Sequence, residues 1–561
     1  MSKTSTNYDD DEKVPAPSAA STSIDLGSGK ITQNIFNKKD AALEKTDYRL
    51  VVQLMGLDTG EQRCGVDIVA VLDVSGSMEG TKLDKLKTSM KFLLKKLDEI
   101  DRLSIVTFSS DAKRLCPLTR MDKNGQAKNE KLINNLFAGG LTNISRALQE
   151  ALSVLGQRRQ RDGRTTAIML MSDGELSKRF DHPSTVDVSS VPVYTFGLGN
   201  DHDSQLLQAI AARSDKGTYS IADVEGSNSA SLNIAFSSCL AGLLSVVVQD
   251  LELTVTQKES EIQEVRAGNY DQVRVNESVK ISFGNLYNRE KRSTTVFLSL
   301  PAVEDRTAMD ILKITFSYRP SGGGALFRSS PVAVTLTRTS SPVTVDPVEV
   351  GNEIARGDTV AAITKARKQA DTNDLNGAQN TMKSAEKSLN NLNREADELI
   401  KALKYEVQEF LRLLKDRKTY LKEGRAFALS SELSHNLQRF AARGDTTQIV
   451  ALAIPLVVLF ANQAVEFDQN INFEVPSANQ DKAAVAEQTA ALDKAEAEEK
   501  KILDEQITAL MDEAQEVEKK EATMKNDPLV TQADTLKHHL GQAIDSLKAI
   551  QDLIAVLQKS P

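Results

Sequence analysis

The segment from Asp73 to Met78, Asp-Val-Ser-Gly-Ser-Met, constrains the fold more than any other feature of the sequence. It follows residues 66–72, a largely apolar run that is typical of a strand buried on both faces of a sheet. It precedes residues 81–97, where leucines and a methionine recur at helical spacing. This order of strand, loop and helix indicates an open α/β sheet, and such sheets bind ligands at the carboxyl ends of their strands.

Two segments further along the chain offer oxygen ligands to the same edge. Residues 139–144 form a glycine-rich turn that contains Thr142, and residues 167–172 form a second apolar run that ends in Asp173. Carboxylates and hydroxyls without His or Cys suit Mg²⁺ or Mn²⁺ better than Zn²⁺. The sequence therefore predicts a site for a hard divalent cation.

Together these segments resemble the von Willebrand factor A (vWA) domain and its metal-ion-dependent adhesion site. The pattern is D-x-S-x-S, a distant Thr and a distant Asp, and the positions that match it are Asp73, Ser75, Ser77, Thr142 and Asp173. The resemblance implies that the two serines and often the threonine touch the metal, while the two aspartates act through water. It also implies an open coordination position for an acidic side chain of a partner protein.

A lone D-x-S-x-S motif is common in loops, so the motif by itself is weak. Here the flanking strands and the order of the Thr and Asp segments fit the family. The alternative is a vestigial site on an intact vWA fold.

The composition limits the class of partner and the compartment. The net charge of −9 gives no electrostatic footprint for nucleic acid. Three scattered cysteines, Cys64, Cys116 and Cys239, form no C-x-x-C pair, and so low and odd a number fits a reducing compartment. The first residues contain no apolar leader segment. We expect a cytoplasmic protein, with the nucleus as the alternative.

One apolar run raises the question of a membrane. Residues 449–461 carry no charge and contain Pro455. The run is shorter than the roughly 20 residues that a spanning helix needs. We expect a buried, kinked core helix and no membrane partner, with a membrane-touching hairpin as the lesser alternative.

The periodicity along the chain predicts a multidomain architecture with a doubly wound α/β domain, a β-sandwich and a helical region. The strand near residues 48–55 has no obvious mate inside the vWA domain, so we expect it to join the sandwich. The expected parts are a disordered tail over 1–38, strands of the β-module over 39–65, the vWA domain over 66–245, the sandwich over 246–345, a helical module over 346–470 and a linker over 471–483.

The last part, residues 484–561, carries heptad-spaced apolar residues on both sides of Asp527-Pro528. An antiparallel helical hairpin is the favoured interpretation. A dimerising coiled coil, which would make the chain a homo-oligomer, is the alternative.

The order of vWA domain, β-module and helical module also resembles a group of plant and other eukaryotic intracellular proteins with a vWA-interacting region. Some of these carry a RING finger and are ubiquitin ligases. A RING finger needs a Cys/His cluster for two zinc ions, which three scattered cysteines do not supply.

The function that we expect is a non-enzymatic, divalent-cation-dependent adaptor that grips an Asp or Glu carboxylate of a partner protein. The sequence contains no H-E-x-x-H motif, phosphate-binding loop or G-x-S-x-G elbow, so we expect no enzyme. Two alternatives stay open. One is a membrane-associated or self-assembling scaffold with a vestigial metal site, and the other is a substrate-binding partner of a ubiquitin ligase that acts in trans.

Overall fold

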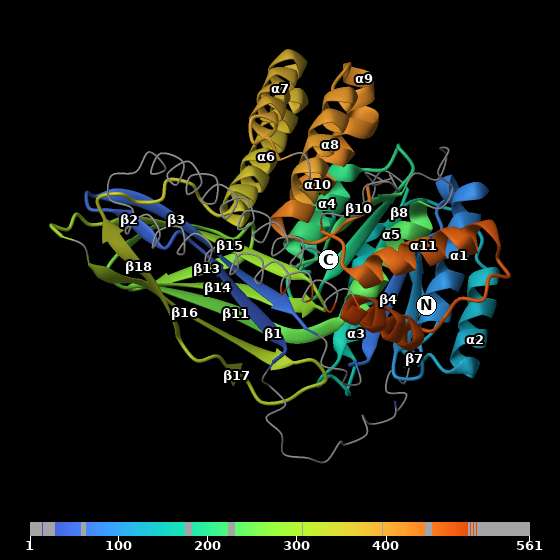
Figure 1. Cartoon of the computed structure of the whole chain (residues 1–561). Helices are drawn as coiled ribbons and strands as arrows, with labels where there is room; N and C mark the ends of the chain where they lie inside the picture. Colours follow the sequence, from blue (N-terminus) through green and yellow to red (C-terminus); the bar gives the residue numbers. More distant parts are fainter. Residues whose placement is uncertain are drawn as a thin grey trace, which may run out of the picture. The chain divides into compact units, whose positions relative to one another are not determined.

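The structure is a computed structural model, and the chain divides into two compact units, residues 1–478 and 479–561. The first unit contains an α/β domain, a β-sandwich and a set of helices (Figure 1). This arrangement confirms the predicted multidomain fold class. The residues that the structure describes are 14, 29–57, 63–173, 182–222, 231–305, 307–394, 397–443, 452–491, 494, 498 and 501.

The α/β domain is built on a seven-stranded sheet. Strands β10, β9, β8, β4 and β5 lie side by side in this order and are parallel, while β6 and β7 pair antiparallel with β5. Every residue of β4 is buried, which explains why its sequence is an almost unbroken apolar run. The strands are β4 Val66–Asp73, β5 Arg102–Phe108, β6 Ala112–Arg114, β7 Thr119–Arg120, β8 Thr165–Ser172, β9 Val193–Leu198 and β10 Tyr219–Ala222.

Helices cover both faces of this sheet. Helices α3 and α4 share a hydrophobic cluster with Val69 and Val71 of β4. Because side chains alternate along a strand, Ile68 and Ala70 point to the other face, where α1 and α5 pack against each other. The helices are α1 Thr81–Lys96, α2 Lys123–Asn134, α3 Ile144–Gly156, α4 Ser204–Arg213 and α5 Ser231–Leu244, with short 3₁₀ turns η1 Gly76–Met78 and η2 Pro183–Thr185.

The β-sandwich consists of two sheets whose apolar faces meet in one core. One sheet has the order β1-β3-β15-β12, and the other has the order β13-β14-β11-β16-β18-β2, with β17 paired to β16. The strands are β1 Ile31–Phe36, β2 Asp40–Ala42, β3 Thr46–Gly56, β11 Val246–Gln257, β12 Glu261–Arg266, β13 Asp271–Val275, β14 Ser278–Tyr287, β15 Lys291–Leu300, β16 Ala308–Pro320, β17 Phe327–Arg328 and β18 Val332–Thr339.

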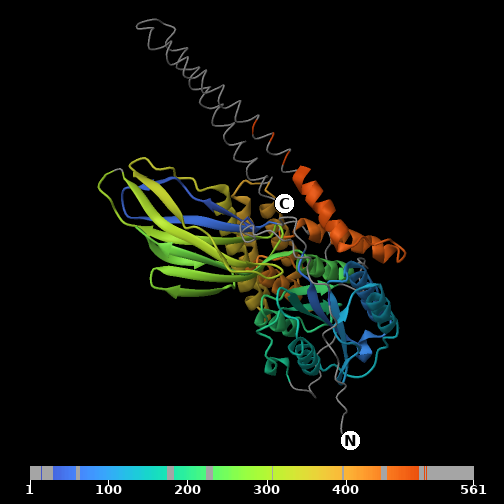
Figure 2. The same cartoon turned by 90° about the horizontal axis from the view of Figure 1, so that it is seen from below.

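The α/β domain is inserted between two strands of the sandwich. Strand β3 precedes the insertion and pairs antiparallel with β15, and β11 follows α5 directly. Figures 1 and 2 show the sandwich strands as a layer apart from the strands of the inserted domain. The structure corrects one part of the predicted domain organisation. Residues 31–36, which we assigned to a disordered tail, form β1 and pair with β3. Half-buried polar side chains in β1 hid this strand from a hydrophobicity argument.

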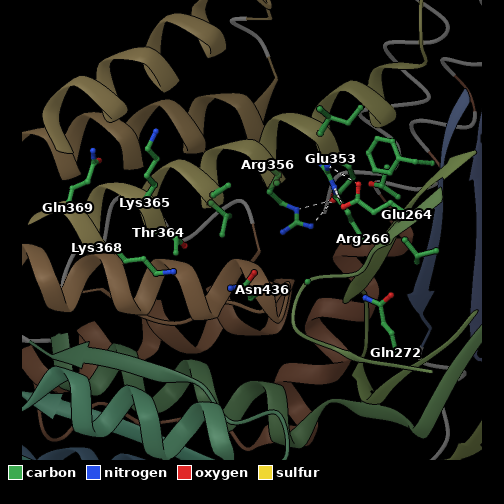
Figure 3. Close-up of a pocket in the computed structure, with 18 of the residues that line it drawn as sticks. Glu264, Arg266, Gln272, Glu353, Arg356, Thr364, Lys365, Lys368, Gln369 and Asn436 are labelled. Carbon is green, nitrogen blue, oxygen red and sulfur yellow. Dashed lines mark hydrogen bonds and ion pairs between the residues drawn. The ribbon is translucent and has the colours of Figure 1, made fainter. Parts of the chain in front are cut away.

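The helical module packs against the sandwich and the α/β domain. Helices α6 and α7 lie side by side, and α10 contacts α6, α4 and β10 (Figure 1). A cavity lies between α6 and the sandwich (Figure 3). The helices are α6 Val348–Asp371, α7 Leu375–Asn390, α8 Glu398–Leu413, α9 Arg417–Thr419, a π-helical turn η3 Tyr420–Gly424, α10 Arg425–Asn436 and α11 Pro455–Gln469.

The apolar run at 449–461 differs from the expected kinked helix. Pro455 is the first residue of α11, where its missing N–H costs no helical hydrogen bond, so it starts the helix instead of bending it. Helix α11 packs on the α/β domain: the rings of Phe467 and Phe92 lie 5.7 Å apart, and Asp468 accepts a hydrogen bond of 2.9 Å from Lys85. In the described part of the chain, no helix combines the length and the apolarity that crossing a membrane requires.

The predicted linker over 471–483 is also corrected, because residues 478–491 are helical. Most of the predicted hairpin or coiled coil over 484–561 lies outside the described residues.

Candidate functional site

The candidate site lies where β4 and β8 end. These strands are parallel neighbours, so Asp73, the last residue of β4, and Asp173, which follows β8, lie at the same edge of the sheet. Both carboxylates are buried. Two acidic groups are thereby held together at the position where an open α/β sheet binds ligands.

Hydrogen bonds to both carboxylate oxygens fix Asp73. Its Oδ1 accepts from the backbone N–H of Ser75 at 2.8 Å, and its Oδ2 accepts from the hydroxyl of Ser172 at 2.7 Å. Burial raises the pKa of Asp73 to about 6, although the hydrogen bonds from these two serines lower it. Asp73 therefore holds the loop in shape through these two hydrogen bonds.

The two serine hydroxyls of the motif face each other and Asp173. Ser75 Oγ lies 3.1 Å from Ser77 Oγ, and Ser77 Oγ donates to Asp173 Oδ1 at 2.8 Å. Ser75 is buried, whereas Ser77 is exposed. The hydroxyl pair thus connects the interior of the loop to the protein surface.

Thr142 is held next to this loop by backbone hydrogen bonds. Gly139 N–H donates to Val74 O at 2.8 Å, and Gly76 N–H donates to Gly140 O at 3.1 Å. Gly140 has φ +92°, a conformation that favours glycine, and an added Cβ there would lie 3.1 Å from the hydroxyl oxygens of two nearby serines. The glycine-rich turn therefore lies against the D-x-S-x-S loop through its backbone.

A lysine that the sequence argument missed completes the site. Lys82, in the first turn of α1, donates from Nζ to Asp173 Oδ2 at 2.7 Å. The sequence places Lys82 in the helix that directly follows the motif, and this position could have pointed to it. A protein cation thus already faces one of the two carboxylates.

The donor set fits a hard divalent cation. Hydroxyls and carboxylates are oxygen ligands, which Mg²⁺ and Mn²⁺ prefer. Within the described ranges, no group of three or more His, Cys, Asp and Glu side chains is placed to hold a metal. This finding argues against a zinc-type site among those residues. It does not bear on a site built on Ser and Thr hydroxyls, because such a site is not made of those four residue types.

Two large apolar side chains close to Thr142 in the sequence are exposed. Phe137 is 81% exposed and Leu141 is 42% exposed. We call these two exposed side chains the apolar rim.

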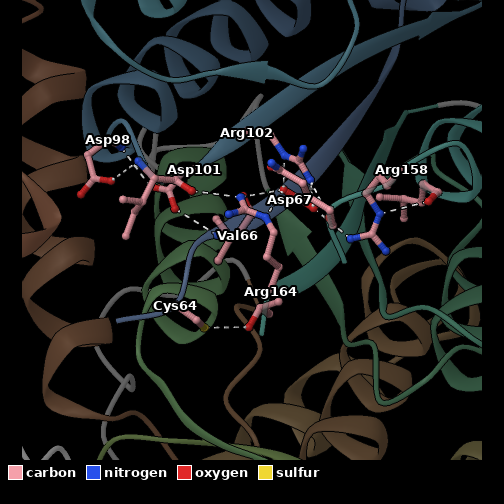
Figure 4. Close-up of polar contacts among 12 residues, drawn as sticks. Cys64, Val66, Asp67, Asp98, Asp101, Arg102, Arg158 and Arg164 are labelled. Carbon is pink, nitrogen blue, oxygen red and sulfur yellow. Dashed lines mark hydrogen bonds and ion pairs between the residues drawn. The ribbon is translucent and has the colours of Figure 1, made fainter. Parts of the chain in front are cut away.

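A second polar cluster lies at the other end of β4 (Figure 4). Asp67 Oδ2 forms ion pairs with Arg102 at 2.7 Å and Arg158 at 2.9 Å, and Asp67 Oδ1 pairs with Arg164 at 2.7 Å. Burial raises the pKa of Asp67, but the hydrogen bonds from Arg102 and Arg164 outweigh it and bring the pKa below its ordinary value. These groups satisfy one another, so we assign the cluster a structural role.

Comparisons with known proteins match two segments of the chain, one in the α/β domain and one in the helical module. Residues 67–232 match the family described as the von Willebrand factor type A domain, and residues 396–461 match the family described as VWA / Hh protein intein-like. The solved structure "von Willebrand factor type A from Catenulispora acidiphila" aligns with a TM-score of 0.55 and 17% identity over 73% of this chain and 97% of that chain. At that identity, the likeness concerns the fold alone.

Two plant relatives resemble the chain in sequence. The E3 ubiquitin-protein ligase WAV3 of Arabidopsis thaliana is 33% identical over 270 residues, which are 45% of this chain and 33% of the relative. The E3 ubiquitin-protein ligase WAVH1 of the same plant is 36% identical over 151 residues, which are 25% of this chain and 21% of the relative. The matches thus span about a third or less of these relatives' length.

These relatives contradict one expectation from the sequence. We expected the chain not to be an enzyme, because it lacks catalytic motifs and a RING-type Cys/His cluster. Relatives named as ubiquitin ligases overturn that expectation, since the shared segments belong to proteins with an enzymatic name.

Proposed function

We propose that this chain, which contains a von Willebrand factor type A domain, uses that domain to bind a partner protein through a divalent cation. Ser75, Ser77 and Thr142 would hold Mg²⁺ or Mn²⁺, with Asp73 and Asp173 behind them. Domains of this family mediate interactions between proteins, which supports a binding role. The hydroxyl pair of Ser75 and Ser77, 3.1 Å apart with Ser77 bonded to Asp173 at 2.8 Å, is the observation that carries the proposal.

The chemistry that the cation would supply is Lewis-acid attraction for a carboxylate of the partner. Neutral hydroxyl ligands leave most of the charge of a dication unneutralised, so an acidic side chain from outside binds strongly. Asp73 already has a donor on each carboxylate oxygen, which suits a positioning role and contact through water. The partner that this site selects is thus a protein that presents an Asp or Glu.

The apolar rim narrows the partner further. Leu141 precedes Thr142 on the glycine-rich turn, Phe137 lies two residues before that turn, and both are exposed. An acidic side chain next to an apolar one would satisfy the cation and the rim together, because burial of aromatic surface adds affinity that a carboxylate alone lacks. We therefore propose a partner segment that combines an Asp or Glu with a large apolar residue.

The ligase names of the relatives suggest where such binding is used. We propose that the domain recognises a protein destined for ubiquitin transfer, as the recognition part of a ubiquitin-ligase system. The proposal rests on the sequence shared with WAV3 and WAVH1.

A Mn²⁺ titration of the full chain, followed by electron paramagnetic resonance, tests the cation site. Acetate in excess serves as the carboxylate that completes the coordination shell. The test variant is Ser75→Ala with Ser77→Ala, and the matched control is Ser384→Ala with Ser388→Ala on α7, whose hydroxyls bond only their own helix.

We expect saturable Mn²⁺ binding in the wild type and the control, and its loss in the test variant. Absence of saturable binding by the wild type, with and without acetate, would refute the proposal. So would equal binding by the test variant.

A further inference from the structure

A second site lies outside the α/β domain, in a groove between α6 and the edge of the sandwich (Figure 3). The cavity has a volume of about 820 Å³, within the range of protein ligand sites. One face of α6 forms its floor, and the end of β12 and the middle of β15 form its wall. We call it the α6 groove.

The helix that forms the floor of the groove contains a glycine that no neighbouring atom of the described chain requires. Gly357 lies inside α6, and a Cβ added there would meet no atom within 4 Å. Glycine weakens a helix interior relative to alanine because its backbone loses more freedom on folding. Ala361, one turn further along, also lines the groove. Two small residues four positions apart leave room for another helix to approach closely.

The charges in the groove are uneven. Figure 3 shows Arg266 beside Glu264 and Arg356 beside Glu353 at one end, and these pairs are 2.7 and 2.8 Å long. At the other end stand two exposed lysines, and neither has an ion-pair partner among the described residues. They are Lys365 and Lys368. The groove therefore offers uncompensated positive charge at one end.

Apolar side chains also line the groove. Phe297 and Val265 from the wall and Val360 from α6 line the cavity. The guanidinium of Arg266 lies over the ring of Phe297, with its central carbon 4.5 Å from the ring centre, which holds this side of the groove in place. An occupant can thus bury an apolar stripe here and place its charge at the lysine end.

We propose that the α6 groove binds an acidic amphipathic helix of a partner protein. Its apolar stripe would lie over Gly357 and Ala361, and its carboxylates would pair with Lys365 and Lys368. This is the mode in which a helix lies in a groove and binds through side chains spaced by one turn. The site is separate from the cation site and needs no metal.

An extended peptide that adds to β12 is the competing occupant. Strand β12 is the edge of its sheet and carries charged residues along its length, Glu261, Glu264 and Arg266. Charges on an edge strand discourage the pairing of a further strand. The edge therefore favours a helix over an added strand.

Peptide display on the full chain tests this proposal. The library consists of randomised 16-residue peptides. EDTA in the buffer removes divalent cations, so that the proposed metal-dependent site cannot bind a peptide. Selection on the wild type is followed by removal of peptides that also bind Gly357→Trp, whose indole would fill the groove from a position with open space above it. Recovered peptides are then titrated against Lys365→Glu with Lys368→Glu. The matched control is Lys383→Glu with Lys387→Glu on α7, whose lysines lie outside the groove.

We expect recovered peptides with Asp and Glu on one helical face and apolar residues on the other. Their affinity should fall at least tenfold in the groove charge variant and stay unchanged in the α7 control. Failure to recover any peptide that depends on the groove would overturn the proposal, as would recovery of peptides without acidic enrichment. Acidic peptides that tolerate a central proline would point to strand addition and overturn the helical occupant. Each variant is used only after its circular dichroism and melting temperature match those of the wild type.

Discussion

The ammonium of Lys82 lies 2.7 Å from Oδ2 of Asp173, the carboxylate whose other oxygen accepts from Ser77. A protein cation is thereby held at the edge of the site that we assign to a metal cation. Two positive charges this close repel each other, even though solvent reduces the effect. We therefore expect Lys82 to weaken the binding of a divalent ion at this site.

Removal of this ammonium should tighten cation binding. For Lys82→Met we expect at least tenfold tighter binding of Mn²⁺, which corresponds to about 1.4 kcal/mol. Lys87→Met is the control, because Lys87 lies on the same helix and bonds the backbone of Asn134 instead. Titration at 50 and 500 mM salt measures both variants. An unchanged or weaker affinity in Lys82→Met would show that the lysine does not compete.

The apolar rim should matter for binding and not for folding. Because Phe137 is 81% exposed, Phe137→Ala should change the free energy of unfolding by less than about 0.5 kcal/mol. Its neighbour Leu136 is buried, so Leu136→Ala should cost about 2–5 kcal/mol. Urea denaturation compares the two. A large loss of stability in Phe137→Ala would mean that the ring packs within the chain and is not a free contact surface.

The open space above Gly357 makes a stability prediction that needs no partner. Gly357→Ala should raise the free energy of unfolding by about 0.5–1 kcal/mol, since alanine favours the helix and meets no neighbour. Gly125→Ala is the opposite case, because its Cβ would lie 1.8 Å from the backbone oxygen of Arg120. Thermal denaturation should show a higher melting temperature than the wild type for Gly357→Ala and a lower one for Gly125→Ala. Destabilisation by Gly357→Ala would show that the position is crowded.

The cluster around Asp67 should give a defined dependence on pH. The folded-state pKa of Asp67 is lowered, because hydrogen bonds from Arg102 and Arg164 outweigh the raising effect of burial. A lowered pKa stabilises the folded state fully above the unfolded-state pKa of about 3.9, and this contribution is lost as the pH falls through the folded-state pKa.

At pH 7, Asp67→Asn should cost roughly 3–5 kcal/mol, because it leaves buried guanidiniums without their anion. This deficit should stay constant down to about pH 4 and shrink below it. Urea denaturation of both proteins at pH 7, 5 and 3 measures the deficit. A deficit that is the same at pH 3 and at pH 7 would contradict the assignment.

The parts of the site that follow strand order could be predicted from the sequence. Residues 66–72 and 167–172 are buried parallel neighbours, so Asp73 and Asp173 had to reach the same sheet edge. Thr142 was assigned by its match to the vWA pattern, and the turn that carries it lies against the loop through backbone hydrogen bonds. Short-range patterns carry such information well because buried strands and tight turns restrict which residues fit.

Other features depended on contacts between distant segments. The approach of Lys82 to Asp173 joins a helix to a different strand, and no spacing rule encodes it. Strand β1 has polar residues at half-buried positions, and its pairing with β3 makes it a strand. Pro455 was expected inside a helix and begins one instead, which a hydrophobic run alone does not distinguish. None of the catalytic motifs considered in the sequence corresponds to the ligase name of the relatives.

The central claim is that Ser75, Ser77 and Thr142 hold a divalent cation. Crystals of the full chain grown with MnCl₂ and acetate, measured at the manganese absorption edge, test it most directly. We predict an anomalous peak about 2.1 Å from the hydroxyl oxygens of Ser75 and Ser77, with Lys82 moved away from Asp173. A map with no peak between these hydroxyls, and Lys82 still paired with Asp173, would contradict the account.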